Sequence, residues 1–325
     1  MQSRVVTLAE QGAPSVMTVE TIDLGMPGAD EVLIKQNIIG FNYMDIYQRS
    51  GLYPLELPSG IGLEAAGTIE AVGANVTGFE AGERVAYATA PCGAYADYRI
   101  FAADRVVHLP DNISDEDCAA TLFKGMTVEY LLNRCYDIKA DEKVLFLGSG
   151  GGVGTLAGQW GKSKGAFMIG VDGGDEKCDL ARQNGYAEVI DFTKENVVTR
   201  VKEITDGEGV PVVYDPIGGP TYEQTLDCLG PRGYFISFGT TGGPMPKVDP
   251  PILQKRDSLY FTRPTVATYT AKREDLETSA KSVFEMIGSG AVKVEIGQRY
   301  ALDEAVKVHE ETEAGKTVGS SILMT

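Results

Sequence analysis

A run of glycines in the middle of the chain has the composition of a phosphate-binding turn. The segment VLFLGSGGGVG, residues 144–154, places five glycines among the seven residues that follow an apolar run. Gly148, Gly151 and Gly154 have the spacing GxxGxxG, so a strict GxGxxG is absent. Glycine in such a turn permits a tight bend and a close approach of backbone N–H groups to a diphosphate. The stretch predicts an anion site, with a glycine-rich packing loop as the alternative.

The residues around the glycines favour nucleotide binding over a packing role. The apolar run before them predicts a strand, and TLAGQWGKSK after them predicts a helix. A second predicted strand ends in Asp172, 21 residues beyond Gly151. A carboxylate there accepts hydrogen bonds from the adenosine ribose and repels a 2′-phosphate, which favours NADH. Lys177 suits either nucleotide, because it can bind a ribose hydroxyl or a phosphate. The alternative role for Asp172 is a helix N-cap.

The elements that must position these residues form a regular pattern from Lys143 onward. Apolar runs with little alternation are separated by helix-like segments, which predicts a parallel sheet covered on both faces. The expected strands are KVLFLG, AFMIGVD, EVID, PVVYDPIG, GYFISFG and SLYFTRP. The first third of the chain instead alternates over short runs split by glycines, which predicts a compact antiparallel β domain or a small barrel. Ser114 and the acidic residues after it predict a helix start.

Composition limits the classes of partner. The chain has 325 residues, a net charge of −17 and a pI near 4.6, which opposes binding to nucleic acid or to an anionic membrane. Five scattered cysteines without a CxxC pair favour reduced thiols. The two histidines, His108 and His309, have no sequence partners at zinc-like spacing, and we expect neither to be catalytic. No apolar run is long enough to span a bilayer and no signal segment is visible, so we expect a cytoplasmic protein.

Five motifs, in order and at compatible spacing, resemble one family. They are FNYMDIYQRSGLYP (41–54), LPSGIGLEAAG (57–67), GSGGGVG (148–154), VVYDPIGG (212–219) and SLYFTRP (258–264). Together they resemble the zinc-independent quinone oxidoreductases, the zeta-crystallin-like branch of the medium-chain dehydrogenase/reductase superfamily.

The resemblance implies an α/β protein with a GroES-like, β-rich catalytic domain and a Rossmann domain with a doubly wound parallel sheet. We expect residues 1–123 to form the first part of the catalytic domain, 124–264 the nucleotide-binding domain, and 265–325 a return to the catalytic domain. A cleft between the domains and a homodimer through the edge strands of the cofactor sheets, near residues 258–264, are also implied.

The same resemblance argues against a metal. Zinc-dependent alcohol dehydrogenases hold their catalytic metal with cysteine and histidine, and the matching positions here are Asn42, Leu63 and Lys124. The four-cysteine structural zinc lobe is missing as well. We therefore expect no metal site.

Hydride transfer without a metal needs other groups near the acceptor oxygen, where negative charge grows. The candidates for catalytic residues are Asn42, Asp45, Tyr47 and Tyr53. The Asn42 amide and the Tyr47 hydroxyl are expected to donate hydrogen bonds to a quinone oxygen or to the nicotinamide carboxamide. Tyr53 is expected to stack on a planar ring or to donate, and Asp45 to orient its neighbours. The alternative is structural, since NxxD is also a helix-capping pattern.

The resemblance also implies cofactor contacts. Lys124 and Thr127 are expected on the ribose and nicotinamide side. Phe192 stands where the family has a tyrosine near the 2′-phosphate, and Lys316 follows the position of a family arginine. The complete set of expected cofactor-binding residues is Lys124, Thr127, Gly151, Gly152, Val153, Gly154, Asp172, Gly173, Lys177, Phe192, Phe238, Gly239 and Thr240. The family favours NADPH and Asp172 favours NADH, so both nucleotides stay open.

The function expected from these observations is reduction of a quinone, or a related conjugated carbonyl, by NAD(P)H without a metal. One alternative is an NAD(P)H-dependent enoyl or alkenal reductase, which has the same cofactor geometry and a different acceptor pocket. Another is a nucleotide-binding protein without turnover, either crystallin-like or RNA-binding. The acidic charge makes RNA the less favoured of these partners.

Overall fold

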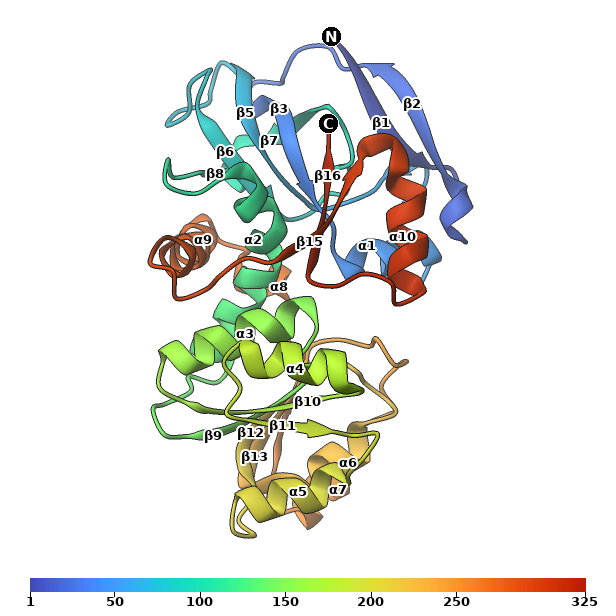
Figure 1. Ribbon diagram of the computed structural model, residues 1–325. Coiled ribbons are helices and arrows are strands. Elements are labelled where there is room, and N and C mark those ends of the chain that lie inside the picture. Colours follow the sequence, from blue (N-terminus) through green and yellow to red (C-terminus); the bar gives the residue numbers. More distant parts are fainter. The chain divides into compact units, whose positions relative to one another are not determined.

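The computed structural model describes residues 1–325, which divide into two compact units (Figure 1). Unit 1 consists of Met1–Met126 and Thr270–Thr325, and unit 2 consists of Thr127–Tyr269. The helix α2 (Asp115–Glu129) crosses this division between Met126 and Thr127, and the π-helical turn Tyr130–Cys135 follows it within unit 2. No helix combines the length and the apolar character needed to span a bilayer.

Unit 1 is built mainly from antiparallel strands. A seven-stranded sheet has the order β15-β16-β3-β5-β6-β8, with β7 paired to β3, and a smaller sheet has the order β2-β1-β4. Only β15 and β16 are parallel. The bounds are β1 Gln2–Leu8, β2 Met17–Asp23, β3 Glu31–Gly40, β4 Ser59–Gly60, β5 Glu64–Val72, β6 Arg84–Ala88, β7 Tyr98–Ala102, β8 Val107–His108, β15 Ile296–Ala301 and β16 Ser320–Met324.

Besides most of α2, unit 1 contains three helices. These helices are α1 (Tyr43–Ser50), α9 (Arg273–Gly288) and α10 (Ala305–Glu313). A hydrophobic cluster of this unit joins side chains from the first strands, from α1 and from α10. It therefore combines residues from both ends of the chain.

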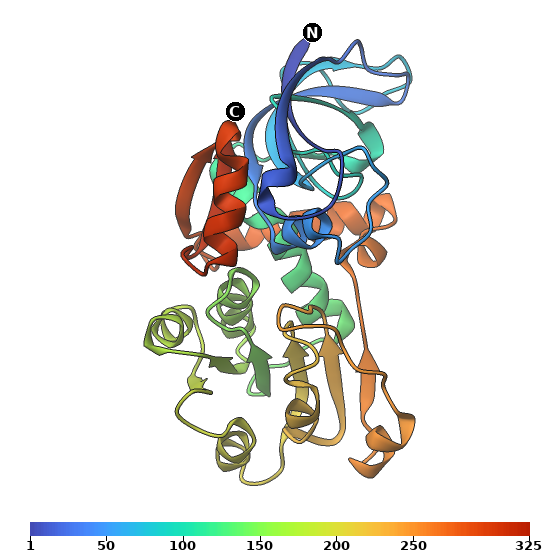
Figure 2. The same cartoon turned by 90° about the vertical axis from the view of Figure 1, so that its right-hand side faces the viewer.

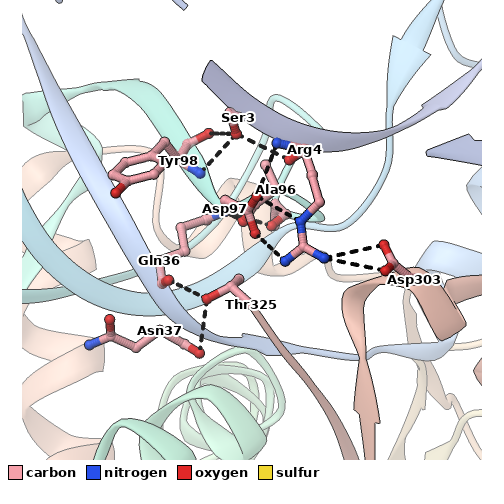
Figure 3. Close-up of polar contacts among 10 residues, drawn as sticks. Ser3, Arg4, Gln36, Asn37, Ala96, Asp97, Tyr98, Asp303 and Thr325 are labelled. Atoms are coloured by element: carbon pink, nitrogen blue, oxygen red, sulfur yellow. Dashed lines mark hydrogen bonds and ion pairs between the residues drawn. The ribbon is translucent and has the colours of Figure 1, made fainter. Parts of the chain in front are cut away.

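Polar contacts also join the ends of the chain within unit 1 (Figure 3). The Arg4 guanidinium forms two hydrogen bonds with the Asp97 carboxylate, over 2.8 and 2.9 Å, and pairs with Asp303 at 3.3 Å. The hydroxyl of Thr325, the last residue, donates to the Gln36 carbonyl over 2.6 Å. The C-terminal segment is thus held against β3 by hydrogen bonds as well as by strand pairing.

Unit 2 contains a six-stranded parallel sheet with the order β11-β10-β9-β12-β13-β14. In chain order its strands are third, second, first, fourth, fifth and sixth, the doubly wound arrangement in which ligands bind where the winding reverses. That reversal lies between β9 and β12. The strands are β9 Lys143–Leu147, β10 Phe167–Asp172, β11 Glu188–Asp191, β12 Val210–Asp215, β13 Leu229–Ser237 and β14 Tyr260–Thr262.

Helices cover both faces of this sheet (Figures 1 and 2). They are α3 Gly152–Ser163, α4 Asp175–Gln183, α5 Val197–Ile204, α6 Tyr222–Leu226 and α7 Pro250–Lys255. The short helix α8 (Val266–Tyr269) follows β14 at the end of this unit. Because both faces are covered, central strands such as β9 bury nearly every residue, which explains their continuous apolar sequences.

Candidate active site

The glycine-rich turn follows the first strand of the parallel sheet. After β9 ends at Leu147, Gly148 adopts a φ of 68°, a backbone conformation that favours glycine. The turn closes through a 3.0 Å hydrogen bond from Gly151 N to the Gly148 carbonyl. A Cβ atom on Gly154 would lie 2.2 Å from that same carbonyl oxygen. The glycines therefore allow the start of α3 to pack directly on the turn.

The first turn of α3 presents backbone donors. Gly151 is the N-cap residue, and the N–H groups of Gly152, Val153 and Gly154 have no acceptor in the protein. Unpaired N–H groups and the positive end of the helix dipole stabilise an anion at this position. The arrangement fits the diphosphate of a dinucleotide, at the place where the winding of the sheet reverses.

The Asp172 side chain supports this turn. It is buried at the end of β10, where Oδ2 accepts from Gly150 N over 2.8 Å and Oδ1 accepts from Gly173 N over 2.9 Å. The N-cap of α4 is Gly174, so the capping role considered for Asp172 does not apply. Each carboxylate oxygen keeps a second lone pair for a ligand.

The other residues expected near the adenosine lie around the end of β10. Phe192 is 58% exposed, and its ring lies so close to Gly173 that a Cβ there would be 2.6 Å from it. Lys177 is exposed on α4, with its Cβ beside Gly150. The structure therefore brings Asp172, Gly173, Lys177 and Phe192 together with the glycine turn.

The residues expected near the nicotinamide follow β13. Phe238 donates its N–H to the Asp215 carbonyl over 2.9 Å, at the end of the neighbouring β12. Gly239 is packed against the Pro216 carbonyl and accepts from Arg263 Nη1 over 2.9 Å. Phe238, Gly239 and Thr240 thus lie at the same edge of the sheet as the glycine turn. Thr127 is buried on α2, one helical turn beyond Lys124.

Unit 1 holds a buried polar cluster made of Asn42, Asp45, Glu64 and Lys124. Asn42 is the N-cap of α1, and its backbone N–H donates to Asp45 Oδ2 over 3.0 Å in the manner of a capping box. Its side-chain Nδ2 donates to Glu64 Oε2 over 2.7 Å. The Lys124 ammonium donates to the carbonyls of Phe41 and Ala120. The residues that cap α1, Asn42 and Asp45, therefore also belong to the buried polar cluster.

The two carboxyl groups of the cluster have pKa values near neutral pH. Burial raises the pKa of Asp45 to about 7, and burial likewise raises the pKa of Glu64 to about 7. Burial lowers the pKa of Lys124, and the two carboxylates act in the opposite direction. Groups with such values can exchange protons at neutral pH, which makes the cluster suited to acid–base work.

An aromatic row lies next to this cluster on α1 and in the loop that follows it. The ring centroids of Tyr43 and Tyr47 are 5.2 Å apart, and those of Tyr47 and Tyr53 are 5.4 Å apart, both in edge-to-face geometry. Tyr47 is 9% exposed, whereas Tyr43 is exposed. The expected catalytic residues Asn42, Asp45, Tyr47 and Tyr53 therefore belong to one region of unit 1.

The donor set of this cluster does not fit zinc. The positions that match metal ligands in zinc-dependent relatives hold an amide already bonded to Glu64, the aliphatic Leu63 and the Lys124 ammonium. An ammonium and an aliphatic side chain cannot ligate Zn²⁺. Nowhere in residues 1–325 do three His, Cys, Asp or Glu side chains gather in a way that could hold a metal ion.

Sequence reasoning missed four residues that contact this region: Glu64, Arg49, Tyr95 and His309. Glu64 had one signal, a carboxylate inside the apolar run GIGLEAAG. The Tyr95 hydroxyl donates to Asp45 Oδ2 over 3.0 Å and lies 3.4 Å from His309 Nε2. These contacts join residues up to 214 positions apart, and no local pattern indicates them.

Comparison with known proteins gives the family. The family described as an alcohol dehydrogenase GroES-like domain matches residues 28–111, and the one described as a zinc-binding dehydrogenase matches residues 152–292. A quinone oxidoreductase from Pseudomonas aeruginosa is 46% identical over 320 residues, covering 98% of each chain. A 2-haloacrylate reductase from a Burkholderia species is 34% identical over 324 residues, covering 97% of each chain.

A solved structure agrees with these relatives. The quinone oxidoreductase of Escherichia coli complexed with NADPH superposes with a TM-score of 0.96 at 42% identity, covering 99% of this chain and 100% of that one. The predicted fold class, a GroES-like β-rich domain with a Rossmann parallel sheet, is confirmed. The chain therefore belongs to the zinc-independent quinone oxidoreductases of the medium-chain dehydrogenase/reductase superfamily.

Proposed function

We propose that this protein is an NADPH:quinone oxidoreductase that reduces a quinone, or a related conjugated carbonyl, without a metal ion. The observation that carries this proposal is the full-length likeness to quinone oxidoreductases, at 46% identity over 98% of both chains for the Pseudomonas aeruginosa protein. NADPH is the assigned cofactor because the Escherichia coli relative was solved as its complex with NADPH.

We assign the diphosphate of the nucleotide to the N–H groups of Gly152, Val153 and Gly154, with Gly151 as the cap of the helix. When bound, the nucleotide supplies the reducing equivalents as hydride. The protein has to bind and orient both partners and to stabilise the negative charge that grows on the acceptor oxygen. Asp172, Gly173, Lys177 and Phe192 are assigned to the adenosine end, and Phe238, Gly239 and Thr240 to the nicotinamide end.

Asn42, Asp45, Tyr47 and Tyr53 are assigned to the acceptor, with Lys124 and Thr127 on the side of the nicotinamide and its ribose. The geometry of the cluster refines the role of Asn42. Its Nδ2 already donates to Glu64, and its buried Oδ1 has no partner. Asn42 is therefore better suited to accept a hydrogen bond from a ligand than to stabilise the acceptor oxygen, and Tyr47 becomes the stronger candidate for that second task.

The test is steady-state oxidation of NADPH with benzoquinone and phenanthrenequinone, with and without a chelator of divalent metals. We expect quinone-dependent turnover that the chelator leaves unchanged. Stoichiometric binding of NADPH without turnover on any acceptor would contradict the proposal, and it would favour a non-catalytic, crystallin-like role.

Reduction of a conjugated carbon–carbon double bond is the second candidate function. The observation in its favour is the 34% identity, over 97% of both chains, to the 2-haloacrylate reductase. Activity on a 2-haloacrylate and on an alkenal, measured beside the two quinones, separates the functions. A kcat/KM on either alkene above that on every quinone would make this candidate the function.

We further propose a homodimer formed through the edge strand β14, and a cytoplasmic location. β14 pairs only with β13, and Tyr260 on it is 52% exposed. An unpaired strand edge is a template for pairing with a second copy. All five cysteines are free, which suits a reducing compartment. Sedimentation of the wild type and of Phe261→Pro tests the dimer, and cell fractionation tests the compartment.

A further inference from the structure

Four buried side chains of unit 1 form a continuous hydrogen-bond network that ends on Asp45. Arg49, in the last turn of α1, donates from Nε to His309 Nδ1 on α10 over 3.3 Å. His309 Nε2 lies 3.4 Å from the hydroxyl of Tyr95. That hydroxyl lies 3.0 Å from Asp45 Oδ2. We call Arg49, His309 and Tyr95 the Arg49 network.

The chemistry of arginine fixes the direction of every bond in this network. A guanidinium carries donors only, so His309 Nδ1 has to accept and cannot carry a proton. The neutral imidazole then carries its proton on Nε2 and donates it to the Tyr95 oxygen. The Tyr95 hydroxyl proton is left to donate to Asp45 Oδ2. Each donor in turn points toward the Asp45 carboxylate.

The far end of the network is anchored. Arg49 is 1% exposed, and its Nη2 pairs with Glu313 Oε1 at the end of α10, while Nη1 donates to the Gly12 carbonyl. Burial, together with the Arg49 charge, lowers the pKa of His309 to about 3. His309 is therefore neutral at physiological pH, as the bond from Arg49 requires.

At the near end, Asp45 receives two donors on one oxygen and none on the other. Oδ2 accepts from Asn42 N and from the Tyr95 hydroxyl, whereas the buried Oδ1 has no partner. Two other ionisable groups change the pKa of Asp45: Glu64 of β5 raises it and Lys124 of α2 lowers it. The Asp45 charge in turn raises the pKa of Cys92, which precedes β7. Only the Tyr95 bond connects Asp45 to α10.

On the basis of the proposed function, we propose that the Arg49 network positions Asp45. It saturates Oδ2 with donors, which favours the charged form of Asp45, and so fixes the first turn of α1, from which Asn42 and Tyr47 are assigned to the acceptor. Arg49, His309 and Tyr95 are positioning residues in this arrangement and do not themselves touch the ligand.

The first test reads the His309 tautomer in the full-length protein without ligand. The chain has two histidines, so ¹⁵N-labelled protein gives two sets of ring signals, and His108→Gln identifies those of His309. We expect Nε2 protonated and Nδ1 unprotonated from pH 5 to 8. A proton on Nδ1, or an imidazolium at pH 6, would overturn the proposal whether or not the protein reduces quinones.

The second test compares two tyrosine variants in the same core. Tyr95→Phe removes the donor to Asp45, and Tyr300→Phe removes a similar phenol–carboxylate bond, to Glu311, away from the cluster. The readout is the carboxyl titration of Asp45 in ligand-free protein, identified by its absence in Asp45→Asn. Losing a donor to the charged form raises the pKa of a carboxyl, so we expect the Tyr95→Phe midpoint to rise by about one pH unit, a tenfold change. Tyr300→Phe should keep the wild-type midpoint.

Two substitutions of His309 test the middle of the Arg49 network. His309→Leu removes both ring nitrogens and should raise the Asp45 midpoint as Tyr95→Phe does. His309→Gln places an N–H donor near the position of Nε2 and should restore most of the wild-type midpoint. Should the leucine variant fail to fold, the tyrosine pair still decides. An unchanged Asp45 midpoint in Tyr95→Phe refutes the network. A shifted midpoint in a protein without quinone turnover keeps the network and refutes the proposed function.

Discussion

The Asn42 amide is fixed by Glu64, because Nδ2 donates to Glu64 Oε2 over 2.7 Å from a strand 22 residues further along the chain. The other Glu64 oxygen accepts from Phe123 N over 2.6 Å. Glu64 is fully buried, so these bonds are made away from water, where an unsatisfied partner costs the most. One carboxylate thus joins the start of α1 to α2.

Glu64→Gln should weaken both folding and catalysis. In the present orientation of Asn42, the new NH₂ group faces either Asn42 Nδ2 or Phe123 N, and both of these are donors. If the Asn42 amide turns over to offer Oδ1, its own NH₂ group is left buried without an acceptor. We expect the free energy of unfolding to fall by about 1–3 kcal/mol and kcat/KM for quinone to fall about tenfold, measured by urea denaturation and steady-state kinetics. Glu70→Gln is the matched control, because Glu70 is exposed on the same strand. Wild-type kinetics in Glu64→Gln would remove Glu64 from the site.

Tyr47→Phe should slow the chemical step with little effect on folding. The hydroxyl is assigned to the growing charge on the acceptor oxygen, and the ring contacts with Tyr43 and Tyr53 survive the substitution. We expect a fall of about tenfold in kcat, equivalent to about 1.4 kcal/mol. Single-turnover oxidation of NADPH is the measurement, with Tyr98→Phe on β7 as the control. A wild-type rate in Tyr47→Phe would show that its hydroxyl does not assist the reaction.

Asp172→Ala should shift nucleotide preference toward NADPH. The substitution removes a negative charge that repels a 2′-phosphate, and it also removes the two bonds to Gly150 N and Gly173 N. We expect the ratio of the Kd values for NADH and NADPH to rise about tenfold, while both nucleotides bind less tightly because the turn loses support. Asp175→Ala is the control, because Asp175 is the exposed first residue of α4. Equal losses for the two nucleotides would mean that Asp172 acts on the turn alone.

Gly154→Ala should impair nucleotide binding. The new Cβ would lie 2.2 Å from the Gly148 carbonyl oxygen, so the turn has to move away from the start of α3. The three N–H groups assigned to the diphosphate would then lose their arrangement. We expect Kd for NADPH, measured by calorimetry, to rise at least tenfold. Unchanged affinity would place the diphosphate elsewhere.

The sequence correctly predicts the features that depend on residues close together along the chain. The apolar runs that become β9 and β10 are buried on both faces, so their lack of alternation, with helix-like segments between the runs, indicates a parallel sheet. The predicted start of α2 is confirmed, with Asp117 N bonded to the Ser114 hydroxyl over 3.0 Å. The capping pattern of Asn42 and Asp45 was also readable, because its two residues lie one turn apart.

The contacts that were missed depend on how distant segments pack. The bond between Arg49 and His309 spans 260 residues, and the one between Asn42 and Glu64 depends on where β5 begins relative to α1. Neither distance in sequence nor residue type selects such a partner. His309 therefore looked like an unpartnered residue on a helix, although its ring is fully buried against Phe41 and Tyr95.

The pH dependence of stability should report His309 directly. Its pKa is lowered to about 3 in the folded protein, against about 6.5 when unfolded. Below pH 6.5 the unfolded chain binds a proton that the folded chain rejects, so this residue destabilises the fold progressively down to about pH 3, by at most about 1.4 kcal/mol per pH unit. Asp45 and Glu64 act oppositely, because burial raises the pKa of each to about 7 and the folded protein takes up their protons first as pH falls.

Comparison of the wild type with His309→Gln isolates the histidine contribution, because both proteins keep the two buried carboxyls. At pH 7 the wild type should be the more stable protein, since the glutamine replaces a buried ring. Between pH 6 and pH 4 the difference in unfolding free energy should shrink by about 2–3 kcal/mol, as only the wild type has a histidine that the unfolded state protonates. Urea denaturation at half-unit pH intervals measures both curves. Parallel curves over this range would mean that His309 takes up a proton in the folded state as readily as in the unfolded one, which a bond from Arg49 to Nδ1 forbids.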